Sequence, residues 1–308
     1  MKKLLLSVFA LSVLMMSCGD DDSTPAILNS DLTLNISGLE DLGDDYVYEG
    51  WVIVASAPIS TGTFTVDGDG KLSETKFSVL SSVLDVADKF VLSIEPAGET
   101  GEAALTPAAT KIIAGDFSGN TASVSTAVGP GVGDFSDAAG NFFLRTPTDE
   151  NGENNGNDEN GIWFGIPGEG PPTAGLTLPT LPDGWVYEGW VVSAAGPIST
   201  GTFTKFDEVD SGNPFSGTEA NAGPPVPGED FFNAAPDGQT FPLDVRGTTV
   251  VISVEPSPDN SASPFLLKPL VKMLSAEALT VGEGENAPNT HDLEQNLSTL
   301  PTGTVTRE

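Results

Sequence analysis

An internal repeat constrains the fold of this chain more than any other feature of its 308 residues. Residues 47–65 read VYEGWVIVASAPISTGTFT and residues 186–204 read VYEGWVVSAAGPISTGTFT, with fifteen of nineteen positions identical at an offset of 139. The shorter segments 91–96 and 251–256 (VLSIEP and VISVEP) match at an offset of 160, so the second copy carries about 21 extra residues between its motifs. A solenoid needs three or more repeats. Two copies therefore indicate two related domains in tandem.

The repeated segments have the composition and alternation of β-strands. Residues 46–54 form a dense run of aromatic and β-branched residues, and residues 32–36 alternate apolar with polar side chains. The runs 90–94 and 250–254 stop at Glu-Pro, where proline cannot donate to a sheet. Further strands are expected at 62–66, 122–126, 141–145, 162–166 and, completing the second copy, 302–306. The sequence predicts an all-β fold of two tandem antiparallel β-sandwiches or flattened barrels.

Glycine, proline and polar runs indicate how the chain is divided. The segment 168–174 (GEGPPTA) combines glycines with paired prolines, so we expect a first β domain over 30–168 and a second over 174–308. The polar run 149–160 is interpreted as a long hairpin loop inside the first domain, and the alternative is a linker between domains. The extra residues of the second copy lie near 206–241, where Gly, Pro and Asp predict a long exposed loop.

The first residues resemble a bacterial lipoprotein signal. A short basic start precedes the apolar run 4–16, which is too short to cross a bilayer, and Ser17 precedes Cys18, the single cysteine of the chain. We expect a signal peptide over 1–17 and an acidic tether over 18–29 that begins at an acylated Cys18. The alternative is an ordinary signal peptide with an incidental cysteine. The acidic cluster after Cys18 favours an outer-membrane lipoprotein exposed at the cell surface, with a periplasm-facing protein as the alternative.

The charge of the chain restricts its partners. The formal net charge of −32 repels nucleic acid, so no nucleic-acid partner is expected. Acylation of Cys18 would leave no thiol for disulfides or catalysis. The expected partners are the lipid bilayer, through the acylated Cys18, and an envelope protein or glycan.

Few residue types suited to catalysis are present. The chain has one histidine, His291, whereas a hydrolytic triad needs a histidine base and histidine metal sites usually need two or three. The sequence therefore predicts that the protein is not an enzyme. A remote alternative is a glycosidase with paired carboxylates, because Glu49 and Glu188 lie beside tryptophans and Glu95 and Glu255 end strands. The simpler interpretation is that each of these carboxylates has a repeated structural role.

No organic cofactor is expected. The sequence supports calcium binding better than it supports catalysis. Acidic turns offer hard oxygen ligands at Asp67, Asp69, Asp207 and Asp210. None of them has the spacing of an EF-hand loop, so solvated acidic turns are the preferred interpretation.

The repeated motifs resemble the extracytoplasmic C-terminal domain of anti-sigma-K factors. That family has an aromatic-x-x-Trp strand, a Gly-x-Phe strand and an apolar strand that ends in Glu-Pro. The matching residues here are Tyr48, Glu49, Trp51 and Glu95 in the first copy and Tyr187, Glu188, Trp190 and Glu255 in the second. The sequence shows neither a sigma-binding region nor a transmembrane run after Cys18, so the resemblance implies only the outer half of such a regulator.

These observations predict a non-catalytic envelope lipoprotein that presents two β domains for protein or glycan binding. The alternative is an accessory sensor in an envelope sigma/anti-sigma pathway, which would act through a membrane-spanning partner.

Overall fold

The computed structural model describes residues 28–150, 156–217, 223–258, 261–284 and 288–308. Strands make up 42% and helices 5% of the structure, and the sheets are antiparallel, with one nearly closed barrel and one half-barrel. The predicted all-β fold class is confirmed. The expected signal peptide, Cys18 and almost all of the tether lie outside the described residues. Within the described part of the chain, no helix combines the length and apolarity needed to span a membrane.

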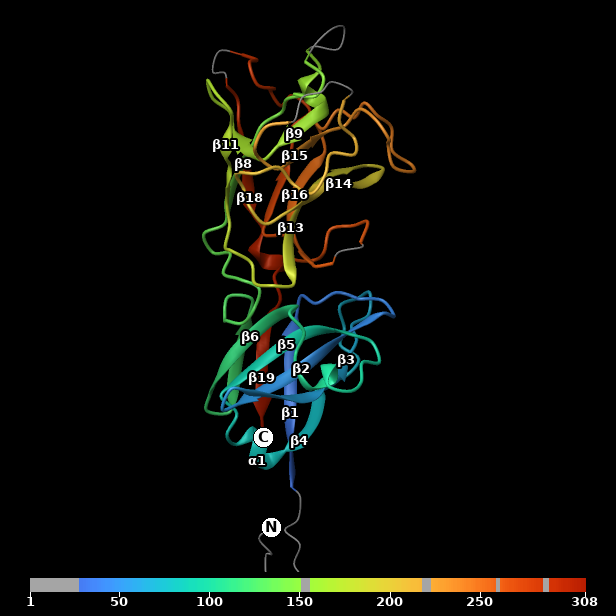
Figure 1. Cartoon of the computed structure of the whole chain (residues 1–308). Coiled ribbons are helices and arrows are strands. Elements are labelled where there is room, and N and C mark those ends of the chain that lie inside the picture. Colours follow the sequence, from blue (N-terminus) through green and yellow to red (C-terminus); the bar gives the residue numbers. More distant parts are fainter. Residues whose placement is uncertain (1–27, 151–155, 218–222, 259–260, 285–287) are drawn as a thin grey trace, which may run out of the picture.

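The first unit is an eight-stranded sheet in the order β3-β2-β5-β6-β7-β19-β1-β4. Its lower position and blue-to-green colours identify it in Figure 1, where the red strand β19 lies within it. The strands are β1 (Asn29–Ser37), β2 (Tyr46–Val54), β3 (Ala57–Phe64), β4 (Lys76–Leu80), β5 (Lys89–Pro96), β6 (Lys111–Ser118), β7 (Thr121–Ser125) and β19 (Thr302–Arg307).

The two outer strands of this sheet approach each other. A Cβ built on Gly62 of β3 would lie 2.9 Å from a ring carbon of Phe77 in β4, so the side chain of Phe77 covers that glycine. Gly62 has φ +125, a backbone conformation that L side chains rarely adopt. The sheet thus curls into the nearly closed barrel.

Strand β19 corrects the expectation that residues 302–306 complete the second copy. It pairs with β1, where Leu32 lies opposite Arg307, and with β7, where Thr302 lies opposite Ser125. Val305 is fully buried, and the Arg307 guanidinium donates to backbone carbonyls at Leu84, Ala87 and Gly119. Local sequence predicts a strand correctly but does not specify which unpaired edge that strand will join.

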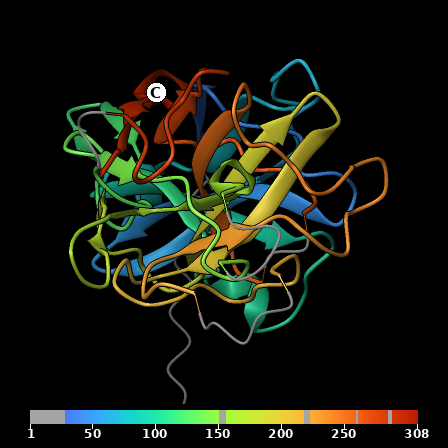
Figure 2. The same ribbon diagram turned by 90° about the horizontal axis from the view of Figure 1, so that it is seen from above.

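The second unit is a seven-stranded sheet in the order β12-β8-β18-β17-β16-β13-β14. It lies above the first unit in Figure 1, and in the view from above the two units project onto one another (Figure 2). Its strands are β8 (Ala139–Phe142), β12 (Leu176–Thr177), β13 (Trp185–Ser193), β14 (Gly196–Phe203), β16 (Thr249–Pro256), β17 (Leu270–Met273) and β18 (His291–Gln295).

Strand pairing assigns the middle of the chain to this second sheet. β8 pairs with β12 and β18, although residues 141–145 were expected in the first domain. The short strand β9 (Gly161–Trp163) pairs with β15 (Gly228–Asp230) in a separate two-stranded sheet. An isolated bridge between Trp163 and Phe143 connects β9 to the segment that follows β8. The segment 168–174, expected as a boundary, contains β11 (Thr173–Ala174), which pairs with β10 (Gly165–Ile166). The chain passes between sheets after Ser125 and returns before Thr302, because strand signals carry no information about distant partners.

The insert near 206–241 is more ordered than its composition suggests. Residues 226–231 are buried, and β15 lies among them. Phe231 is fully buried and packs between Phe215 and Phe241. The expectation of a long exposed loop is therefore wrong for this part of the insert, since its aromatic residues fill the core of the half-barrel.

Among the residues that the structure describes, helical structure consists of single turns at connections. The turns are α1 (Ser81–Leu84), η1 (Ala103–Leu105), η3 (Asp158–Asn160) and η4 (Leu297–Thr299).

Candidate functional site

The repeated motif residues form the same buried hydrogen-bond network in both units. In the first unit the Trp51 indole donates to Ser93 Oγ at 2.9 Å, and the Ser93 hydroxyl donates to Glu95. Glu95 also accepts from the backbone N–H of Ala108 at 2.8 Å. Ser60 donates to Glu49 on the neighbouring strand.

The second unit repeats each of these contacts. Trp190 donates to Ser253 at 2.8 Å, and Ser253 donates to Glu255. Glu255 accepts from the N–H of Phe265 at 2.9 Å, and Ser199 donates to Glu188. The four glutamates are each at most 8% exposed. Burial raises the pKa of Glu49 and Glu95, while their serine partners act in the opposite direction.

The remaining motif residues anchor the segment before each repeated hairpin. The Tyr48 hydroxyl donates to the carbonyl of Glu40 at 3.1 Å, and the Tyr187 hydroxyl donates to the carbonyl of Pro179 at 2.6 Å. Trp51 packs with Val91 and Ala114 in a small cluster separate from the main core. The motif residues therefore stabilise two equivalent hairpins, and their carboxylates already accept hydrogen bonds.

The calcium candidates occupy different kinds of turn. Asp67 accepts the backbone N–H groups of Asp69 and Lys71 at 3.1 and 2.9 Å, and these bonds close the acidic turn. Asp210 accepts the N–H of Gly228 at 2.9 Å, and burial raises its pKa to about 7. Asp207 is exposed. In the described ranges, no group of three or more His, Cys, Asp or Glu side chains could hold a metal ion.

His291, the single histidine of the chain, begins β18. Its Nε2 lies 2.9 Å from the carbonyl oxygen of Leu279, and its ring packs on Phe142.

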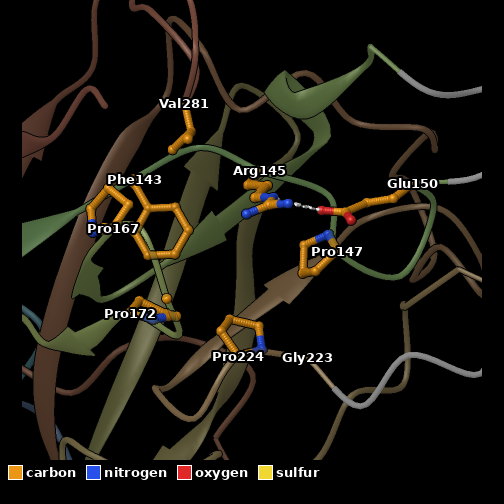
Figure 3. Close-up of a pocket in the computed structure, with 11 residues that line it drawn as sticks. Phe143, Arg145, Pro147, Glu150, Pro167, Pro172, Gly223, Pro224 and Val281 are labelled. Atoms are coloured by element: carbon orange, nitrogen blue, oxygen red, sulfur yellow. Dashed lines mark hydrogen bonds and ion pairs between the residues drawn. The ribbon is translucent and has the colours of Figure 1, made fainter. Parts of the chain in front are cut away.

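A pocket of about 370 Å³ opens at the free end of the second unit. Figure 1 places β9 and β11 at this end, opposite the first unit. Figure 3 shows Phe143 and several prolines around the pocket, and Arg145 and Glu150 paired with each other beside Pro147. The Arg145 guanidinium lies 2.5 Å from the Glu150 carboxylate, and 46% of the Arg145 side chain is exposed. The pocket combines an aromatic ring, proline rings and an accessible ion pair.

The buried carboxylate of Asp230 fixes the position of residues 145–148, which form one wall of this pocket. Asp230 of β15 accepts from the Thr148 N–H at 2.9 Å and from the Thr148 hydroxyl at 2.6 Å. It also accepts from the Trp163 indole at 3.0 Å, and that indole donates to the Arg145 carbonyl at 3.1 Å. Burial raises the pKa of Asp230 to about 6. These bonds make the segment between residues 145 and 148 a fixed wall rather than a free loop.

The carboxylate of Glu229, next to Asp230, fixes the position of residues 215–216 in the insert. Glu229 accepts from the Ser216 hydroxyl at 2.6 Å and from the Phe215 N–H at 3.2 Å, and burial raises its pKa to about 7.

Sequence reasoning missed the pocket residues Phe143 and Arg145 and the supporting pair Glu229 and Asp230. A signal for the pair is present, because two adjacent acids stand directly before Phe231 within an apolar run. Acidic residues with such neighbours are buried only when they are hydrogen-bonded.

The chain matches no known family model, no curated protein and no solved structure.

Proposed function

We propose that this protein is a non-catalytic envelope lipoprotein that binds a protein or glycan at the free end of its second β unit. The observation that carries the proposal is the pocket at Phe143 and Arg145, which lies at the end of the molecule far from the start of β1 (Figure 1). A chain anchored through Cys18 would hold this end outward from the membrane.

The residues that line the pocket support the binding of a protein or glycan that offers both apolar and polar groups. Aromatic and proline rings offer flat apolar contact, and arginine and aromatic residues dominate binding energy at interfaces. The rigid wall held by Asp230 lowers the entropy cost of binding, because the pocket is formed before a partner arrives. The repeated glutamates, which would be the carboxylates of a glycosidase, are buried and hydrogen-bonded in both units.

The relation to the anti-sigma-K extracytoplasmic domain is likewise a proposal. Its support is the repeated Tyr-x-x-Trp strand, which pairs in both copies with the strand that ends in Glu-Pro.

Proteinase K treatment of intact cells tests the location. We expect cleavage of the wild type while a periplasmic marker survives, and release of a Cys18→Ala variant from the membrane fraction. Protection until the outer membrane is opened would contradict surface display and favour the periplasmic sensory role.

Binding of the purified full chain to isolated cell envelopes and to purified peptidoglycan tests the pocket. Arg145→Ala should weaken binding at least about tenfold. Arg246→Ala is the matched control, because Arg246 pairs with Asp244 and Glu159 and lies outside the pocket lining. Equal binding by both variants would overturn the proposed site.

A further inference from the structure

A second cavity lies between the two units. It has a volume of about 510 Å³. Beside it the backbones of the units touch, since a Cβ built on Gly184 would lie 2.9 Å from the carbonyl carbon of Ala109. Cavities between domains are frequent ligand sites.

The repeated Glu-Pro motifs build the two walls of this cleft. Pro96 ends β5 and Pro256 ends β16, and both line the cleft. Glu95 accepts a hydrogen bond from the N–H of Ala108, and Glu255 accepts one from the N–H of Phe265. Ala108 and Phe265 also line the cleft. The shared geometry of the two copies thus places equivalent strand ends on opposite sides of one cavity.

The wall surfaces are mainly apolar. The first unit contributes Leu42, Ile94 and Pro96, and the second contributes Pro256 and Phe265. The Phe265 ring packs on the buried Trp185 ring with centroids 6.1 Å apart, which fixes its position. An apolar part of a ligand would find preformed contacts here.

One end of the cleft is acidic. Glu40 and Asp41 line it, and the described lining contains no basic side chain. Burial raises the pKa of Glu40 to about 7, Glu255 and Asp41 act in the same direction, and Lys268 opposes them. The Lys111 ammonium donates to the carbonyl of Ala108 at 2.6 Å. Neither Lys111 nor Lys268 lines the cleft, whereas Glu40 and Asp41 do, so a ligand would contact these two carboxyl groups. Tyr46, which is 43% exposed, also lines the cleft, and an aromatic ring attracts a cation placed over its face.

We propose that this cleft binds a small apolar molecule that carries one positive charge. Its ammonium group would lie at Glu40 and Asp41, and its apolar part would lie against Ile94, Pro96 and Phe265. The proposal goes beyond the envelope-binding function, and it depends neither on the lipid anchor nor on the pocket at Arg145.

Isothermal titration of the full chain with three matched probes tests the charge preference. The probes are 4-phenylbutylamine, the neutral 4-phenylbutanol and the anionic 4-phenylbutyrate. We expect the amine to bind at least tenfold more tightly than the alcohol, and the acid to bind more weakly still. Equal binding of all three probes, or no binding of the amine, would overturn the proposal.

Three variants separate the cleft from the general negative charge of the protein. Glu40→Gln should weaken amine binding at least tenfold, since hydrogen bonds to charged groups are the stronger ones. Ala108→Trp should abolish it by filling the cleft, and circular dichroism checks that the fold is kept. Glu277→Gln removes an exposed carboxylate outside the cleft and should leave binding unchanged. Undiminished amine binding by Ala108→Trp and Glu40→Gln would show that the amine binds elsewhere and would reject the site.

Discussion

The same hairpin is completed in two different ways in the two units. Gly62 and Gly201 are equivalent in the repeat, and both have φ +125. Gly62 faces Phe77 of strand β4, whereas Gly201 faces Asp210 in the insert, whose carboxylate carbon would lie 2.7 Å from a Cβ built on that glycine. A strand therefore closes the first unit, and a loop with the half-buried Asp210 occupies the corresponding position in the second.

A second pair of glycines shows how the cores compensate. A Cβ on Gly50 would meet the Phe90 ring at 3.1 Å, whereas a Cβ on Gly189 would meet the Phe164 ring at 2.5 Å. The second copy has Val250 where the first has Phe90. An aromatic ring from another segment fills the space that the smaller valine leaves. The comparison teaches that the repeat specifies a hairpin and its polar network, while each unit recruits its own closing elements.

Deleting residues 302–308 should have the largest effect and should act on one unit only. β1 and β7 would both lose their partner strand, so the first unit should lose cooperative folding, a loss of about 5–15 kcal/mol for a typical domain. Hydrogen exchange followed by mass spectrometry of peptides measures this. Peptides of β13 and β16 are the internal control, and equal protection of β1 before and after deletion would contradict the pairing.

Phe90→Ala and Phe164→Ala should each destabilise its own unit by about 3–5 kcal/mol, because each leaves a cavity against an equivalent glycine. Thermal unfolding with exchange data for each unit measures both. If Phe164→Ala mainly exposed the first unit, the proposed equivalence of the two rings would be wrong.

Ser93→Ala and Ser253→Ala should cost about 1–3 kcal/mol each, and by nearly equal amounts. Each removes the acceptor of a buried indole N–H and the donor to a buried carboxylate. Chemical denaturation compares the two variants. A clear difference between them would show that the repeated network has different energetic weight in the two units.

The last difference between the units concerns pH. Burial raises the pKa of Asp210 to about 7 in the folded state, whereas an aspartate in the unfolded chain has a pKa of about 4. Between about pH 4 and pH 7 the folded state therefore keeps a proton that the unfolded state has already lost. The contribution of this group to stability therefore rises as pH falls from 8 to 5. Asp210→Asn should reduce that rise by about 1.4 kcal/mol for each unit of pKa difference.

Melting temperatures at pH 5 and pH 8 give the measurement for Asp210→Asn. The exposed Asp116 provides the control variant Asp116→Asn, which should leave the pH dependence unchanged. An identical pH dependence in wild type and Asp210→Asn would mean that Asp210 is charged in the folded state at neutral pH.

Local sequence determined the strands and the repeated hairpin, because alternation and β-branched residues act over a few neighbouring positions. Residues 46–54 form β2 as predicted, and the residues predicted at 90–94 and 250–254 lie in β5 and β16. Trp51 and Trp190 are both buried in the repeated strands, and Trp51 lies in a separate small cluster.

Only the tertiary structure decided which strands share a sheet and where the cavities lie. β19 joins β1 from the opposite end of the described chain, and Arg145 meets Glu150 in a pocket supported by Asp230. Pairing between distant edges depends on which edges remain unpaired after the local hairpins have formed, and a strand signal does not encode this. The cleft between the units arises for the same reason, since two equivalent Glu-Pro ends face each other only after both sheets are assembled.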